Sequence, residues 1–262
     1  MTRYLRLYLH FLRFSLSRAM AFRFDFFFKF FMDLAWYATQ VGFYLALFRH
    51  TPTLGGWTRD QALIFVAGFL CVDSLYMTLF SHNSFLFPTL VNRGDLDYYL
   101  VRPVSSLFFM TLREFSANSL MNLTAGMGVM TWALLRYPEP LGAERVALFA
   151  GLILNGGLLF AIIHFLFLVP VFWLHSDRAL SEIFWAGTSL TNRPHRIFPG
   201  WLGRLLLTAL PFSVMASFPA QILFEGPSWQ TLLHVLAVTG GAFLFLCWLW
   251  RQGLRAYGSA SS

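Results

Sequence analysis

The chain has 262 residues, of which 57% are hydrophobic and only 12% are charged. Soluble domains carry about 25% charged residues, so this composition excludes an ordinary soluble protein and indicates a single membrane domain. The formal net charge of +7 is almost entirely due to arginine, because Lys29 is the only lysine. The positions of these arginines in the sequence decide whether the charge indicates nucleic-acid binding or membrane topology.

The first segment, residues 1–24, is predicted to be an amphipathic helix that lies in the membrane plane. Its polar residues recur at spacings of three and four, which places them on one helical face, and most of the others are Leu, Phe, Tyr or Met. Two interpretations stay open: a plain anchor, and an elbow that follows the motion of the first span. The residues of the polar face are Arg3, Arg6, His10, Arg13 and Ser17.

Six apolar stretches follow, and each is long enough for a helix that crosses a bilayer, which needs about 20 residues. The expected fold is therefore all-α: a polytopic membrane protein with six transmembrane helices in residues 25–255 and a short tail at 256–262. Pro211 and Pro219 should kink or break the fifth helix. The predicted spans are 26–48, 61–81, 107–135, 146–174, 203–224 and 231–250.

The basic residues fall unevenly on the two sides of these spans. If the amino terminus is cytoplasmic, 15 Arg and Lys residues lie inside, including Arg178, Arg193, Arg196 and Arg204 in the fourth loop. Only four remain outside: Arg49, Arg59, Arg136 and Arg145. This bias follows the positive-inside rule and predicts that both termini are cytoplasmic. The basic charge is thus explained by topology, and we expect no nucleic-acid partner.

Few charges occur inside the spans. Lys29 and Asp33 are four residues apart and can form a structural pair. Asp73 lies near the middle of the second span without a nearby cation, which makes it a candidate for a translocation path. The alternative is that Asp73 bonds a Ser, Thr or Asn on a neighbouring helix, for example Asn118 or Asn122. Three further candidates for the path are Glu114, Pro211 and Pro219.

No motif for catalysis or cofactor binding is found. A P-loop needs a lysine in G-x-x-x-x-G-K-[ST], and Lys29 stands between two phenylalanines. Cys71 and Cys247 both fall in apolar runs, which favours buried thiols over a metal site or a disulfide. We therefore expect no enzyme activity and no metal, ATP or other cofactor on this chain.

A polar block at residues 91–103 separates the second and third apolar stretches. A membrane protein that presents a short loop to a water-soluble partner would need such a block. Gly94 can turn the chain, Asp95 can cap a short helix, and Arg102-Pro103 can end that helix. Alternatively, the tyrosines simply sit among lipid headgroups. The predicted contact residues are Arg93, Gly94, Asp95, Leu96, Asp97, Tyr98, Tyr99, Leu100, Arg102 and Pro103.

At this block the sequence resembles the ABC-2-type transporter permease family, in particular its six-span bacterial branch of ABC exporter permeases. That branch carries a G-x-L-D-x-x-L-x-R-P pattern after the second span, and here it reads Gly94-Asp95-Leu96-Asp97-Tyr98-Tyr99-Leu100-Val101-Arg102-Pro103. A second, weaker block agrees with it: Arg196-Ile197-Phe198-Pro199, Pro211-Phe212, Phe218-Pro219-Ala220 and Gly226.

The resemblance implies the permease subunit of an ATP-driven exporter in the bacterial cytoplasmic (inner) membrane. Two permease halves, identical or sister chains, would enclose a path lined by spans one, two and five. A separate ATPase subunit would hold ATP and Mg and would dock on a coupling loop at residues 82–106. The chain from Pro219 to Pro227 would partly re-enter the membrane. Two rival functions stay open: an ion-coupled secondary transporter and a membrane enzyme that acts on lipids.

Overall fold

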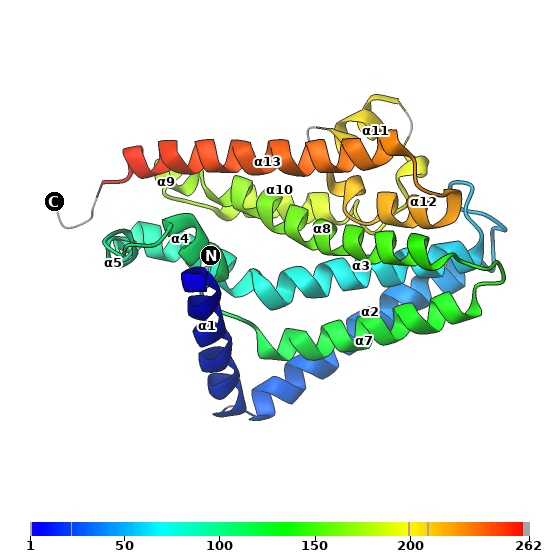
Figure 1. Cartoon of the computed structure of the whole chain (residues 1–262), viewed down its shortest axis with the longest axis horizontal. Helices are drawn as coiled ribbons and strands as arrows, with labels where there is room; N and C mark the ends of the chain where they lie inside the picture. The colour runs from blue at the N-terminus through cyan, green and yellow to red at the C-terminus, as the bar shows by residue number, and fades with distance from the viewer. Residues whose placement is uncertain (1, 22, 199, 209, 259–262) are drawn as a thin grey trace.

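The computed structural model describes residues 2–21, 23–198, 200–208 and 210–258; Pro199 of the second motif lies outside them, as do the side chains of Arg3 and Asn118. Within these ranges all regular structure is helical, apart from one isolated bridge between Leu54 and Trp57, so the predicted all-α class is confirmed. The longer helices run side by side (Figure 1). They are α1 (Thr2–Ala21), α2 (Arg23–Leu47), α3 (Arg59–Leu79), α4 (Ser81–Arg93), α7 (Ala117–Arg136), α8 (Ala143–Leu168), α10 (Arg178–Thr188) and α13 (Trp229–Ala256). The shorter ones are α5 (Asp97–Leu100), α6 (Ser106–Leu112), α9 (Val171–Leu174), η1 (His195–Ile197), α11 (Gly200–Leu207), η2 (Phe212–Val214) and α12 (Ser217–Glu225).

Helix α3 is the centre of the bundle. It begins at a capping box, in which the Thr58 side chain accepts from the Gln61 amide and the Gln61 side chain accepts from the Thr58 amide. Most of its residues are buried, because α2, α7, α8 and α12 surround it. An apolar helix that is buried on all sides needs no amphipathic pattern, so a uniformly hydrophobic sequence suffices here.

Three helical segments are long and apolar enough to cross a membrane by themselves: Arg59–Leu79, Ala143–Leu174 and Trp229–Ala256, within the described part of the chain. Helix α13 is the most peripheral of the three and exposes large apolar side chains such as Leu236, Leu244 and Trp248. In water such an apolar surface would promote aggregation, whereas in a membrane lipid tails cover it.

Two predicted spans are wrong as single helices. The stretch 107–135 is divided into α6 and α7, with a break at residues 113–116. The stretch 203–224 is divided into α11, η2 and α12. Pro211 stands at that second break, where a residue without an amide hydrogen and with a fixed φ ends the helix. Pro219 instead lies in the first turn of α12, where the missing amide costs no helical hydrogen bond.

The segment before α13 forms a hairpin that enters the bundle and returns. At its start, Arg196 pairs with Glu225 and Ile197 lies 3.2 Å from where a Cβ of Gly55 would be. Its turn reaches the middle of α8, because the Met215 carbonyl lies against Gly156. It ends at Gly226, beside Arg145 at the beginning of α8. The fifth passage through the bundle is therefore made by α10 and the residues after it, not by 203–224.

This path corrects the predicted distribution of charge. Arg196 lies at the end of the bundle that carries Gly55 and Glu225, opposite to α5. Arg193 lies at the same end, since the Tyr44 hydroxyl near the end of α2 donates to the adjacent Asn192 carbonyl at 2.5 Å. The topology predicted from the sequence places both on the inner side, because it takes every apolar run as one crossing. The bias toward the α5 end is smaller than predicted but keeps its direction.

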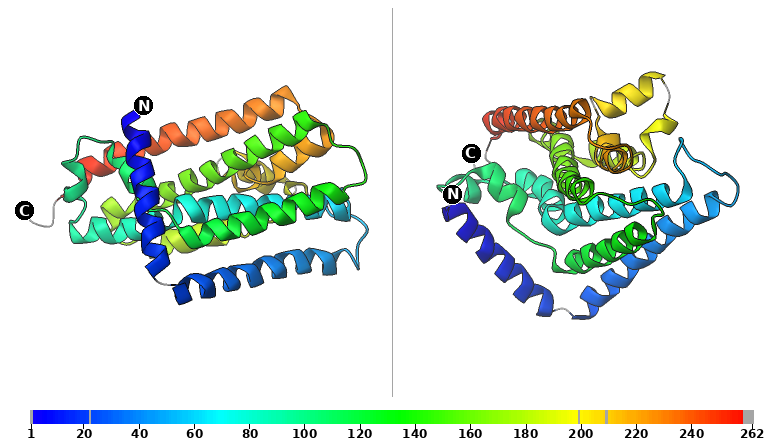
Figure 2. Two further views of the ribbon diagram at one scale, coloured as in Figure 1. Left: turned by 60° about the horizontal axis from the view of Figure 1, so that its bottom comes forward. Right: turned by 45° about the vertical axis from the view of Figure 1, so that its right-hand side comes forward.

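Helix α1 crosses the bundle at a steep angle, and its first residue lies near α4 and α5 (Figure 1 and Figure 2). It is attached just before α6 and in the break that follows α6. The Tyr4 hydroxyl accepts from the Ser105 amide at 3.3 Å, and the Ser15 hydroxyl accepts from the Phe115 amide at 3.1 Å. Helix α1 thus contacts the α5 end of the molecule directly.

Close packing at Gly156 gives a stability prediction. A Cβ there would lie 2.3 Å from the Met215 carbonyl oxygen and 2.9 Å from Val72, whereas a Cβ at Gly151 of the same helix meets nothing within 4 Å. Gly156→Ala should cost about 1–3 kcal/mol, because backbone must move. Gly151→Ala should be neutral or stabilising. Thermal unfolding in detergent checks this, and equal midpoints for the two variants would contradict the hairpin packing.

Candidate functional site

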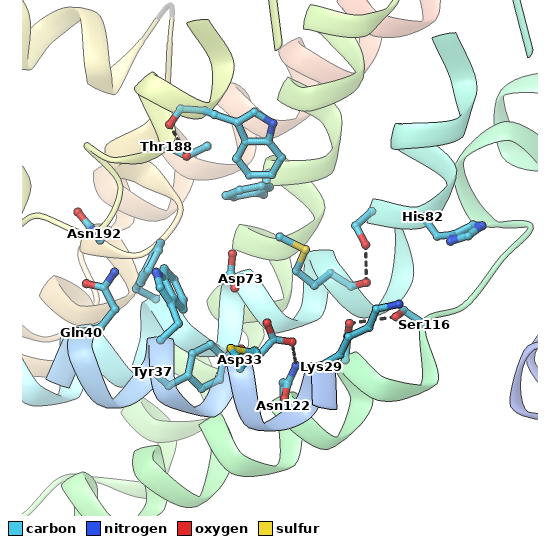
Figure 3. A pocket seen from close by; sticks show the side chains of 18 of the residues that line it. Lys29, Asp33, Tyr37, Gln40, Asp73, His82, Ser116, Asn122, Thr188 and Asn192 are labelled. Atoms are coloured by element: carbon cyan, nitrogen blue, oxygen red, sulfur yellow. Dashed lines mark hydrogen bonds between the residues drawn. The ribbon is translucent and has the colours of Figure 1, made fainter. Parts of the chain in front are cut away.

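A cavity of about 910 Å³ lies between α2, α3, α4, α7 and α10. Its lining combines aromatic rings with polar groups, as Figure 3 shows. The aromatic residues are Phe28, Trp36, Tyr37, Phe69, Phe85, Phe160 and Trp185. The polar residues are Lys29, Asp33, Gln40, Asp73, Ser81, His82, Ser116, Ser119, Asn122, Thr188, Ser189 and Asn192. We call this space the polar cavity.

Helix α2 supplies a polar stripe to the cavity. Lys29, Asp33, Tyr37 and Gln40 follow one another at spacings of four, four and three, which places them on one face. Asp33 accepts a hydrogen bond from the Asn122 amide at 2.5 Å and lies within reach of the positive charge of Lys29. The predicted proximity of Lys29 and Asp33 is therefore observed, although both residues belong to the cavity wall.

Asp73 enters the same cavity from the middle of α3, close enough to Asp33 for the two carboxylates to repel each other. Among the described side chains we find none that donates a hydrogen bond to it or forms an ion pair with it. The structure shows no hydrogen bond from Asn122 to Asp73, and the Asn122 amide donates to Asp33 instead. The Asn118 side chain lies outside the described part of the structure.

The other predicted path residues do not line the polar cavity. Pro211 lines a separate, mainly apolar cavity of about 540 Å³ between α8, α10 and α13. Pro219 is buried in α12. Glu114 lies behind the wall, where it binds a lining residue: its Oε2 is 2.8 Å from Nε2 of His82.

Glu114 connects the cavity wall to α5. Its Oε1 accepts from Arg113 at 2.9 Å, and the same guanidinium donates to the Tyr99 hydroxyl and lies 5.0 Å from the centre of the Tyr99 ring. The chain of contacts therefore runs from His82 through Glu114 and Arg113 to Tyr99. It connects α4 at the cavity with α5 through charged and hydrogen-bonding side chains.

Asn83 holds the break between α6 and α7 in place. Its side-chain amide donates to the carbonyls of Thr111 at 3.1 Å and Glu114 at 2.8 Å, and its carbonyl accepts from the Glu114 amide at 3.0 Å. The Ser116 amide donates to the Thr78 carbonyl at 2.9 Å. Broken helices leave backbone groups without partners, and burying them unpaired is costly. Asn83 therefore makes the break possible and orients Glu114.

The predicted coupling segment, residues 82–106, is mostly helical, because α4 extends to Arg93. Gly94 ends α4 with φ +78°, a conformation that side chains rarely adopt, so its predicted role as a turn is confirmed. The predicted cap by Asp95 is wrong: α5 follows Leu96, and no side chain caps it. Instead, the Asp97 amide donates to the Gly94 carbonyl at 3.4 Å and closes the turn before α5.

The short helix α5 divides the predicted contact residues into two groups. Leu96 is fully buried and Tyr99 packs on Phe109, with ring centres 5.2 Å apart. By contrast, Tyr98 is 71% exposed and the neighbouring Val101 is 83% exposed. The remaining exposed members are Arg93, Leu100, Arg102 and Pro103. The segment thus has an inner face that attaches it and an outer face that is free within this chain.

The inner face belongs to a hydrophobic cluster that includes Leu96, Phe109 and Trp250. The Trp250 indole donates to the Ser106 hydroxyl at 3.1 Å, which ties α13 to α6. Beyond α13, burial and then the nearby negative charge of Asp97 raise the pKa of Tyr257 above its usual value. The α5 end is therefore packed against α6, α9 and α13.

Several lining residues were not singled out from the sequence. On α2, Tyr37 and Gln40 follow Asp33 at helical spacing, so the sequence pattern alone could have indicated a polar face. Trp185, Asn192 and their neighbours gave no such signal, because the fifth passage was assigned to the wrong residues. Val101 was overlooked because it is an apolar residue within a polar block.

Water access to the polar cavity can be tested with cysteine. In a variant without Cys71 and Cys247, Ser189→Cys should react quickly with a small, charged thiol reagent, because Ser189 is exposed and lines the cavity. Ser74→Cys should stay unreactive, because Ser74 is fully buried beside it on α3. Labelling rates in membranes provide the measurement. An unreactive Ser189→Cys would show that the cavity is closed to water.

Comparison with known proteins adds the family. Residues 34–261 match the family described as ABC-2 family transporter protein. The match includes every helix from α3 onward and most of α2, but not α1. No curated protein and no solved structure matches the chain significantly. Because the match extends over most of the chain, the protein belongs to the ABC-2 family of transporter proteins and is a membrane component of ABC-type transport.

Proposed function

We propose that this chain is the permease subunit of an ABC exporter, and that an ATPase subunit moves it through the segment 82–106. The observation that supports this most is the contact path from α5 to the polar cavity, through Tyr99, Arg113, Glu114 and His82. A permease needs both a docking surface and a path, and it needs a physical connection between them. The family match explains why an ATPase partner is expected at all.

The docking surface is the outer face of α5. An exposed tyrosine beside an exposed aliphatic residue and several arginines is the composition that interface hot spots prefer. Tyr98 and Val101 provide the apolar centre, and Arg93 and Arg102 stand at its edge. In this arrangement α5, α1 and both termini face the cytoplasm of a bacterial inner membrane, and α1 lies in its interface. ATP and Mg are held by the partner subunit.

The translocation path is the polar cavity. Its walls include α2, α3 and α10, which correspond to the first, second and corrected fifth passages. A second permease half, identical or a sister chain, would close the cavity on its open side. Closure of the ATPase dimer on ATP would displace α5 and tilt the helices around the cavity, a rigid-body alternation of access. Export is then driven by hydrolysis on another subunit, and this chain carries out no catalysis.

The docking surface is tested by removing its apolar centre. Tyr98→Ala combined with Val101→Ala should reduce copurification of the ATPase subunit at least tenfold, because loss of two central contacts typically costs more than about 1.4 kcal/mol. Insertion and thermal stability should not change, since both side chains are exposed.

The matched control is Leu135→Ala with Trp229→Ala. These residues are 82% and 78% exposed. They stand at the end of α7 and the start of α13, and Figure 1 shows these helix ends opposite to α5. This pair should leave ATPase association intact. Full association of the Tyr98–Val101 variant would refute docking on α5, and transport that needs only an ion gradient would favour a secondary transporter.

The connection from α5 to the cavity is tested by Glu114→Gln. The amide keeps the shape of the side chain but removes the charge that holds His82 and Arg113. We expect normal assembly with the ATPase and a severalfold loss of transport for each ATP hydrolysed. Glu144→Gln, an exposed residue in the first turn of α8, is the control and should transport normally. Unchanged coupling in Glu114→Gln would contradict the proposed contact path.

A further inference from the structure

The charges of the polar cavity do not balance. Asp33 has a local cation in Lys29 and a hydrogen bond from Asn122. His82, also in the wall, is engaged by Glu114. Asp73 contributes a second carboxylate for which the described cavity lining offers no counter-charge. A carboxylate in a membrane-embedded space is costly unless a positive charge or a proton reaches it.

The side chains around Asp73 indicate which kind of cation can bind beside it. Tyr37, Phe69 and Phe160 lie in the same wall, and Phe85 and Trp185 stack with ring centres 6.0 Å apart and planes 16° from parallel. Aromatic faces attract cations and bury apolar surface equally well. A small metal ion would instead need several oxygen or nitrogen ligands together, and no group of three metal-binding side chains occurs among the residues that the structure describes.

We infer that the polar cavity binds an amphipathic organic cation, whose charge pairs with Asp73 and whose apolar body lies against the aromatic wall. The volume of about 910 Å³ falls in the range of about 300–1,000 Å³ that drug-sized ligands occupy. Gln40, Thr188 and Asn192 lie elsewhere in the lining and can hydrogen-bond polar substituents. The inference rests on the proposed function only in treating this cavity as part of the path.

The geometry also predicts unequal roles for the two acids (Figure 3). Asp33 is already compensated by Lys29 and Asn122, so its removal should affect a cationic ligand less than removal of Asp73. Asp60 lies on the same helix as Asp73 but is exposed at the far end, which makes it a control for charge alone.

The test is equilibrium binding of tetraphenylphosphonium to the full chain in lipid nanodiscs, with binding to empty nanodiscs subtracted. Tetraphenylborate has nearly the same shape and the opposite charge. We expect the wild type to bind the cation and to bind the anion at least tenfold more weakly. Asp73→Asn should lose at least about tenfold in affinity for the cation, the effect of 1.4 kcal/mol. Asp33→Asn should lose less, and Asp60→Asn should stay within twofold of the wild type.

Equal binding of the two ions, no binding of either, or an Asp73→Asn variant that keeps its affinity would overturn the inference. Trp185→Leu checks the aromatic wall without changing any charge, and it should weaken the cation severalfold. Copurification of the ATPase with Asp73→Asn separates the two proposals. If the complex forms while selectivity for the cation is absent, the ligand class is wrong and the permease function stands. If the wild type binds the cation but no ATPase associates, the permease function is wrong and the ligand class stands.

Discussion

The hydrogen bonds of Asn83 are the interaction on which the rest of the arrangement depends. In an apolar environment a helix can be interrupted only if other groups bind the freed backbone atoms. Asn83 does so for Thr111 and Glu114 with three hydrogen bonds from one side chain. Because the chain can break there, α6 turns away from α7 to pack against α1, α4 and α5. The same break positions Glu114 between the cavity wall and α5.

A second constraint follows from the cost of polar groups in a membrane protein. Helices α2 and α3 bring two carboxylates, Asp33 and Asp73, into the lining of the polar cavity. Asp33 is stabilised by neighbours on α2 and α7, so it can be part of a static framework. Asp73 has no comparable support. A protein gains nothing in stability from such a residue, which is why the cavity is more readily explained by transport than by packing.

The sequence predicted the parts of the fold that depend on local pattern. The uniformly apolar runs at α3, α8 and α13 were recognised because length and hydropathy alone determine such helices. The turn at Gly94 was predictable, since a left-handed residue after a polar helix end favours glycine. The family resemblance carried by residues 94–103 was confirmed by the match over residues 34–261.

What failed depends on contacts between distant residues. The break after α6 could not be foreseen, because its partner Asn83 lies 31 residues before Glu114. The hairpin before α13 was mistaken for a crossing, since an apolar segment that enters and returns has the same composition as one that spans. That error also misplaced Arg196, whose pairing with Glu225 fixes it at the end opposite to α5. That Leu96, directly before α5, is buried while Tyr98 within it is exposed likewise depends on neighbours on α6 and α13.

The central claim is that movement of α5 by an ATPase changes access to the polar cavity. The most direct measurement is the labelling rate of Ser189→Cys in the assembled transporter, with and without a non-hydrolysable ATP analogue. The account predicts that the analogue changes this rate severalfold, and that Glu114→Gln removes the change while the complex stays assembled. A labelling rate that is independent of nucleotide in a complex that hydrolyses ATP would contradict it.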